Sequence, residues 1–208
     1  MIFWPWYTFK AITFIRDRLH KTMRVFEYGC GSSTIFYAQR CGQVIAVDHN
    51  HEWIQKVIRE AKTDGKVEIT HVEPDGMDEW MRKYHAELHF DNAHPNNYFS
   101  KGWKAYFRKY VRWIDRYPNE SFDVISIDGA ARPSEMKHAI PKLAPGGMLI
   151  LDNSERPRYA QGVALAPSGW HRHDFPGTGS VNSWRQATEG ETRTKKWQTT
   201  VWIKPNAA

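Results

Sequence analysis

The feature that most constrains the fold is a tight glycine turn between a short strand and an amphipathic helix. Residues 23–28 are rich in apolar, β-branched and aromatic side chains, which predicts a strand, and Gly29 and Gly31 end it. A Ser/Ser/Thr cluster follows and can cap a helix over residues 33–41. Glycines let backbone N–H groups approach a ligand closely, and the helix end supplies further donors. The unit therefore predicts a ligand-binding turn.

The second strand identifies the kind of ligand. Residues 43–48 predict a strand that ends at Asp48, where a carboxylate can accept hydrogen bonds from the two hydroxyls of a ribose. Thr34 stands where a dinucleotide fingerprint has its third glycine, and the turn has no lysine for a phosphate-binding loop. Glu27 precedes the first glycine by two positions and suits a ligand that carries an ammonium and a sulfonium. These residues favour a nucleoside ligand other than NAD or ATP.

Glu-x-Gly-x-Gly, followed by an acidic residue at the end of the next strand, resembles motif I of the class I S-adenosylmethionine-dependent methyltransferases. A second stretch is similar to the same family: a strand over residues 122–127 ends at Asp128, a helix begins at 133–134, and Leu-Ala-Pro-Gly-Gly leads into a strand that ends at Asp152. Asp-Asn-Ser-Glu-Arg-Pro after that strand resembles a bacterial-type subgroup whose substrates are not fixed. The resemblance covers residues 23–203.

Strands that alternate with helices predict an α/β fold, with a mostly parallel sheet and helices on both faces. The resemblance implies one Rossmann-like domain over residues 1–208, with seven strands and a C-terminal antiparallel hairpin formed by residues 170–175 and 199–203. We expect an N-terminal helical extension over residues 1–22, with its helix at 8–20. We also expect a helical insertion over 74–121 that covers the acceptor site.

Within the insertion, residues 77–84 predict a short helix and residues 100–116 a second one. Aromatic and aliphatic residues at helical spacing form one stripe on the second helix, and cations lie elsewhere on it. Such a stripe is more typical of a packed core than of a nucleic-acid surface. The histidines at 85, 89 and 94 match no common zinc spacing. The insertion therefore predicts neither a nucleic-acid surface nor a zinc site.

Five successive strands end in or beside a carboxylate, and the ligand crevice of an open α/β sheet lies at that edge. The resemblance implies that Gly29 and Gly31 hold the methionine part of the cofactor and that Glu27 binds its amino group, directly or through water. It places Asp48 on the ribose and Glu73 near the adenine. The cofactor-binding set that it implies further contains Tyr28, Ser32, Ser33, Thr34, His49 and Asp128.

Asp128 and Asp152 are the candidate catalytic residues. Together with Asn153 they partly resemble the metal ligands of catechol-type O-methyltransferases, but the lysine base of those enzymes is missing here. Three interpretations stay open. The first is a divalent ion such as Mg²⁺ that lowers the pKa of the acceptor oxygen. The second is a metal-free site in which either aspartate acts as base or orienter and Arg132 or Arg156 binds an acidic acceptor. The third is that Asp128 only closes the cofactor pocket and that Asp152 and Asn153 form a turn.

Composition favours an ordinary basic enzyme. The 208 residues carry a formal net charge of +6, which is too modest to favour nucleic-acid binding. Two cysteines form no disulfide or zinc pattern, so a reducing, cytoplasmic setting is expected. The apolar N-terminal run is too short to span a membrane and lacks the features of a signal peptide. We therefore expect no membrane partner.

The acceptor is the least determined part. No Asn-Pro-Pro-Tyr type of motif for methylation of base amino groups occurs, which favours an oxygen acceptor on a small molecule or a sugar. The alternatives are an RNA or protein methyltransferase that uses the basic segment 100–116, and a non-catalytic S-adenosylmethionine-binding module. The oligomeric state does not follow from the sequence.

Overall fold

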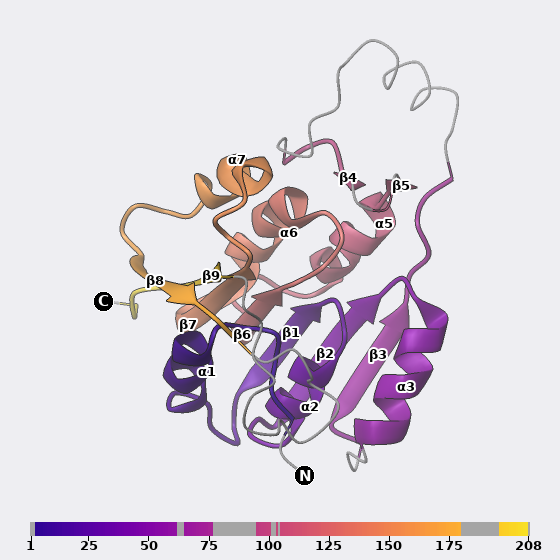
Figure 1. The fold of residues 1–208 in the computed structure, drawn as a ribbon, viewed down its shortest axis with the longest axis horizontal. Coiled ribbons are helices and arrows are strands. Elements are labelled where there is room, and N and C mark those ends of the chain that lie inside the picture. The colour runs from indigo at the N-terminus through magenta and orange to yellow at the C-terminus, as the bar shows by residue number, and fades with distance from the viewer. Residues whose placement is uncertain are drawn as a thin grey trace.

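The computed structural model describes residues 3–61, 65–76, 95–100, 103, 105–179 and 196–207 (Figure 1). A seven-stranded sheet with the order β3-β2-β1-β6-β7-β9-β8 forms its centre. Five strands run parallel, and β9 is antiparallel to both of its neighbours, which confirms the mostly parallel sheet with a C-terminal antiparallel hairpin. The strands are β1 (Arg24–Tyr28), β2 (Gln43–Asp48), β3 (Val67–His71), β6 (Phe122–Ile127), β7 (Leu143–Asp152), β8 (His171–Gly177) and β9 (Trp197–Ile203).

Helices cover both faces of this sheet (Figure 1). One face packs against α1 (Phe9–Arg16), α2 (Ser32–Ala38) and α3 (His51–Ala61). The other face packs against α5 (Arg108–Val111), the 3₁₀ helix η1 (Arg112–Arg116) and α6 (Arg132–Ala139). The short elements η2 (Ile140–Lys142), η3 (Pro157–Tyr159) and α7 (Ala160–Val163) complete the second layer.

Side chains alternate in direction along each strand, and this alternation divides the core into one part on each face of the sheet. On β1, Val25 packs with α1 and α2, whereas Phe26 and Tyr28 join the cluster under α5 and α6. Alternate side chains of a strand point to opposite faces, so a sheet that is covered on both sides reads as a nearly continuous apolar run. The only position of β1 that breaks its buried apolar run is Glu27, which is fully buried.

The insertion differs from the prediction. The expected helix over residues 100–116 begins only at Arg108, and it is preceded by the two-residue strands β4 (Phe99–Ser100) and β5 (Ala105–Tyr106). Backbone pairing of Phe99 with Tyr106 requires the chain to reverse between them, which leaves Trp103 at the turn with 58% of its surface exposed. The expected helix over residues 77–84 lies outside the described residues.

The N-terminal helix is shorter than expected, because α1 ends at Arg16 rather than at residue 20. Its apolar side is fully buried at Ile12 and Ile15, so the helical extension packs on the sheet as part of the domain. Within the part of the chain that the structure describes, no helix is long and apolar enough to cross a bilayer.

Candidate functional site

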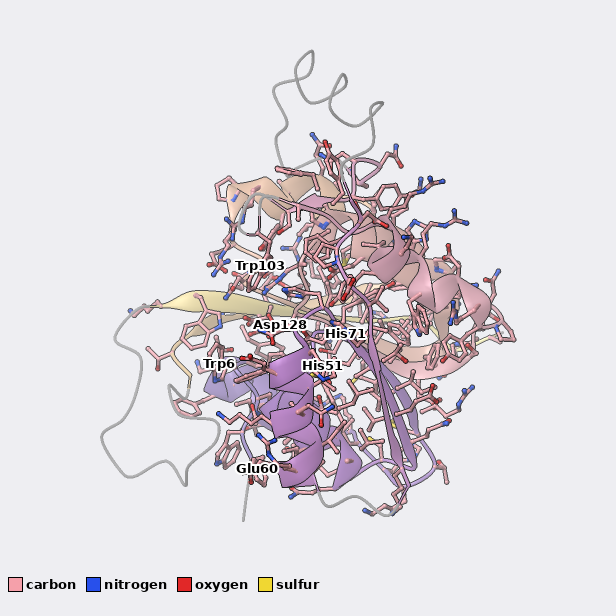
Figure 2. The ribbon with its side chains drawn as sticks, turned by 90° about the vertical axis from the view of Figure 1, so that its right-hand side faces the viewer. Trp6, His51, Glu60, His71, Trp103 and Asp128 are labelled. Carbon is pink, nitrogen blue, oxygen red and sulfur yellow. The ribbon has the colours of Figure 1, made fainter. Side chains whose placement is uncertain are left out.

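A cavity of about 540 Å³ lies at the carboxyl ends of β1, β2, β6 and β7, and we call it the ligand cavity. Trp6 and Trp103 flank it, with Asp128 between them in the view of Figure 2. The carboxyl ends of parallel strands meet at this edge, where open α/β sheets bind their ligands. Of the predicted site residues, the cavity is lined by Gly29, Gly31, Ser32, Ser33, Asp48, His49, Asp128 and Asp152.

The glycine turn has a backbone that only glycine adopts without strain. Gly29 has a φ of 85°, and a Cβ atom there would lie 2.9 Å from the backbone oxygen of Asp128. Asp48 holds the turn from the neighbouring strand, since its Oδ2 accepts a hydrogen bond of 2.9 Å from the Cys30 N–H. The other oxygen of Asp48 accepts from the N–H of Asn50 at 2.8 Å. The turn is thus fixed against the ends of β2 and β6.

Glu27 lies behind this turn, with Tyr28 and Thr34, rather than in the cavity. The Thr34 hydroxyl donates to Glu27 Oε2 at 2.5 Å and accepts from the Gly31 N–H at 2.8 Å. Burial raises the pKa of Glu27 to about 8, although hydrogen bonds from Ser33 and Thr34 oppose the rise. In this arrangement Glu27 orders the turn through Thr34.

His49 connects the ligand cavity to a side cavity of about 420 Å³. Its ring lies 4.4 Å from that of Trp103, centroid to centroid, and its buried Nε2 has no hydrogen-bond partner among the described residues. Burial lowers the pKa of His49, against the opposing effect of Asp48, so the ring is neutral at pH 7. The exposed Glu73 lines the side cavity. An unpaired polar atom beside an indole suits a planar, polar ligand group.

On the other side of the ligand cavity, Arg132 crosses between two strand ends. Its guanidinium pairs with Asp128 Oδ1 and donates to the backbone oxygens of Asp152 and Gly129. Burial is the largest single influence and lowers the pKa of Arg132, but Asp128 and the other nearby acidic groups together outweigh it, so the net shift is upward. Arg132 is therefore a permanent cation whose donors are already engaged within the protein.

Asp152 is buried at the end of β7 and is held from β9. Its Oδ1 accepts hydrogen bonds from Trp197 Nε1 at 3.0 Å and from the Thr199 hydroxyl at 2.8 Å. Burial, followed by the charge of Asp128, raises the pKa of Asp152 well above its usual range. The site thus contains two carboxyl groups with different environments: one is paired with a guanidinium, and one is desolvated.

By sequence, the chain matches no protein-family profile and no curated protein. Solved structures with a similar fold include a precorrin-6y C5,15-methyltransferase from Geobacter metallireducens, with a TM-score of 0.56 and 14% identity over 93% of this chain and 87% of that one. The O-methyltransferase TomG from Streptomyces achromogenes, solved in complex with SAM (S-adenosylmethionine), has a TM-score of 0.55 and 16% identity over 93% and 77% of the two chains. An rRNA methylase from Streptococcus thermophilus has a TM-score of 0.56 and 11% identity over 95% of each chain.

This chain has the class I methyltransferase fold. The resemblance inferred from the glycine turn and the strand-end aspartates is confirmed at the level of the fold. Neighbours with this fold act on different acceptors, so the fold leaves the substrate open.

The side chains of this site do not fit the divalent ion that catechol-type methyltransferases bind. Asp128 Oδ1 is paired with Arg132, and Asn153 Oδ1 lies 3.5 Å from the same guanidinium. Asp152 Oδ1 already accepts two hydrogen bonds from other side chains. The guanidinium of Arg132 lies between Asp128 and Asn153, where those two residues would share a metal ion. Among the described residues, no three His, Cys, Asp or Glu side chains form a group that could hold a metal ion.

Two residues at or beside the site, the buried Glu135 and the half-buried Trp53, were not predicted. Glu135 lies under the loop after β6, where its Oε1 accepts a hydrogen bond of 2.8 Å from the Ala131 N–H, and burial raises its pKa to about 7. A Cβ atom on Gly129 would lie 2.5 Å from that same oxygen, so a larger residue there would have to displace the Glu135 carboxyl group. Trp53 Nε1 donates to the Cys30 carbonyl at 2.6 Å and lines the ligand cavity. An acidic residue in the first turn of α6 was the one sequence signal for Glu135.

Proposed function

We propose that the protein is a methyltransferase that binds S-adenosylmethionine and methylates a hydroxyl oxygen of a small molecule or a sugar. The observation that carries this proposal is the joint placement of the Gly29 turn and the buried Asp48 carboxylate on one cavity at the strand ends. Two similar folds support it: TomG was solved with SAM, and an O-methyltransferase from Bacillus cereus, 16% identical over 88% of this chain, was solved with SAH.

The residues that line the ligand cavity and its side cavity fit this cofactor. The backbone of Gly29, Gly31 and Ser32 would hold the methionine part, and Asp48 would accept from the ribose hydroxyls. The neutral His49 ring, with its unpaired Nε2 next to Trp103, would border the adenine, and Glu73 lies on that side. We assign Glu27 the role of positioning the turn through Thr34. Bound S-adenosylmethionine supplies an electrophilic methyl group.

We assign the base to Asp152. A general base works best when its pKa lies near the operating pH, and burial moves the pKa of Asp152 in that direction. Asp152 would take the proton of the acceptor hydroxyl as that oxygen forms its bond to the methyl carbon, and the cofactor would supply the methyl group and leave as the neutral thioether. Asp128 is engaged by Arg132, which suits it to fixing the loop geometry rather than to moving a proton.

The test is transfer of a tritiated methyl group from S-adenosylmethionine to a panel of hydroxylated acids, phenols and sugars, with bulk RNA and a protein lysate in parallel. We expect label on a small hydroxylated compound. Label on RNA alone, with salt-dependent binding, would support the RNA methyltransferase. Cofactor binding without transfer to any class would support a non-catalytic module.

A further inference from the structure

We propose that the acceptor is an organic anion with an apolar body, and that Arg156 binds its negative group. This inference rests on the proposed function and names the substrate class of the same site. It starts from a difference between the two arginines that line the ligand cavity, Arg132 and Arg156.

Arg132 is saturated by partners within the protein. Its guanidinium engages Asp128 and the backbone oxygens of Asp152 and Gly129, and it is buried. A charged ligand could recruit it only by breaking the pair with Asp128, which would leave that carboxylate uncompensated. Arg132 is therefore a fixed part of the wall.

Arg156 has the opposite character. It is half-buried, and its guanidinium makes no hydrogen bond or ion pair within the described part of the chain. The ring of Tyr159, with its centroid 5.9 Å from Cζ, is an aromatic neighbour rather than a counter-ion. The backbone N–H of Arg156 donates to the Asn153 carbonyl at 3.1 Å, which fixes the turn after β7. A cation held at a cavity without a counter-ion is matched by an anionic ligand group.

Arg156 also lines a second cavity of about 520 Å³ and, among the described residues, is the one shared by the linings of the two cavities. The second cavity is bordered by Trp170, Trp202, Pro157 and Val163, so much of its wall is apolar. Its other arginine, Arg172, is already paired with Asp174 at 3.1 Å. An apolar body in this cavity would place a negative group at Arg156.

The proposed anion-binding residue lies close in the chain to the proposed base. Asp152 and Arg156 lie on either side of the turn after β7, so the proposed base and the proposed anion partner border the ligand cavity together. The acceptor hydroxyl would therefore face Asp152 while the anionic group of the same molecule contacts Arg156. Aromatic hydroxy acids combine these three features in one small molecule.

The experiment titrates protein saturated with S-adenosylhomocysteine, and protein without it, with three acids whose hydroxyl lies next to the acid-bearing carbon of the ring: 2-hydroxybenzoate, 2-hydroxyphenylacetate and 2-hydroxycinnamate. Each acid is compared with its primary amide, which keeps shape and hydroxyl but lacks the charge. We expect at least one acid to bind about tenfold tighter than its amide, as one charge-assisted contact provides. The variant Arg156→Gln should lose this preference.

Arg59→Gln, an exposed arginine on α3, makes the same charge change away from both cavities and should keep the preference. The proposal is overturned if no acid binds better than its amide to the native protein, or if Arg156→Gln retains the difference. Binding of S-adenosylhomocysteine is measured first in the same samples. Its failure would reject the proposed function, whereas normal binding without an acid preference would reject only this inference.

Discussion

Arg132 and Asp128 form an ion pair four residues apart, with side-chain exposures of 10% and 25%. The pair joins the loop after β6 to the first residue of α6, and the same guanidinium reaches the backbone of Asp152 on β7. One buried cation therefore holds two strand ends together at the wall of the ligand cavity.

Replacing this cation should destabilise the fold. Arg132→Met would leave the Asp128 carboxylate without its counter-charge and two backbone oxygens without a donor. We expect the free energy of unfolding, measured by urea titration, to fall by about 3–5 kcal/mol. Arg156→Met removes a half-buried arginine that is not ion-paired and is the matched control, with an expected change within about 0.5 kcal/mol. Equal losses in the two variants would contradict this account of the pair.

The stability of the protein should depend on Glu27. Its pKa is about 8 in the fold against an ordinary value of 4.5, so the folded state holds a proton that the unfolded chain releases. Proton binding by Glu27 therefore supports the stability of the fold in full below pH 4.5, and this support is lost as the pH rises to about 8. Glu27→Gln should be more stable than the native protein by about 4–5 kcal/mol at pH 8.5 and by little at pH 4. Denaturant unfolding at pH 4 and pH 8.5 measures the two stability differences. Glu68→Gln, at an exposed position of β3, is the control. A stability difference between Glu27→Gln and the native protein that does not change with pH would reject this prediction.

Comparing Gly29→Ala with Gly65→Ala separates the cost of a left-handed backbone from the cost of a steric contact between the new Cβ atom and its neighbours. Both glycines have positive φ, 85° and 72°. A Cβ atom on Gly65 meets no atom of the described residues within 4 Å, whereas one on Gly29 meets the Asp128 backbone. The left-handed conformation alone costs about 1–2 kcal/mol, so Gly65→Ala should lose that amount of stability. Gly29→Ala should lose more and should also weaken cofactor binding, as calorimetry would record. Equal stability losses with unchanged affinity would show that close approach at Gly29 is unimportant.

The rate of methyl transfer should follow the ionisation of Asp152. A base must be deprotonated, so the rate should rise with pH through the raised pKa of Asp152. Asp152→Asn should lower kcat by about 10²–10⁴-fold and change cofactor affinity by less than about threefold. Thr199→Val removes a hydrogen bond that favours the charged form, so its rate profile should shift to higher pH. An unchanged profile in both variants would exclude Asp152 as the base.

Local features were predictable from the sequence. The glycine turn and the aspartate at the end of β2 depend on residues close together in the chain, and the alternation of strands and helices predicted the sheet. The helix boundary at Arg108 could not be predicted, because the aromatic spacing of Trp103, Phe107 and Tyr110 continues a helical pattern through a segment that reverses direction.

The partners of the site side chains depended on packing between distant elements. Whether Arg132 or a metal ion would lie between Asp128 and Asn153 was decided by how α6 packs against β6 and β7. The burial of Glu27 behind the turn likewise depends on the layers above and below β1. Residue types along one strand do not contain that information.

The most direct test of the account is calorimetric titration of the native protein, Asp48→Asn and Asp123→Asn with S-adenosylmethionine. Asp123 lies near the amino end of β6, away from the ligand cavity, and accepts a hydrogen bond from the Arg24 N–H at 2.7 Å. Asp123→Asn therefore controls for the loss of a structural carboxylate. We predict that the native protein and Asp123→Asn bind the cofactor and that Asp48→Asn binds it at least about tenfold more weakly. No binding by the native protein, or equal binding by Asp48→Asn, would contradict the central claim.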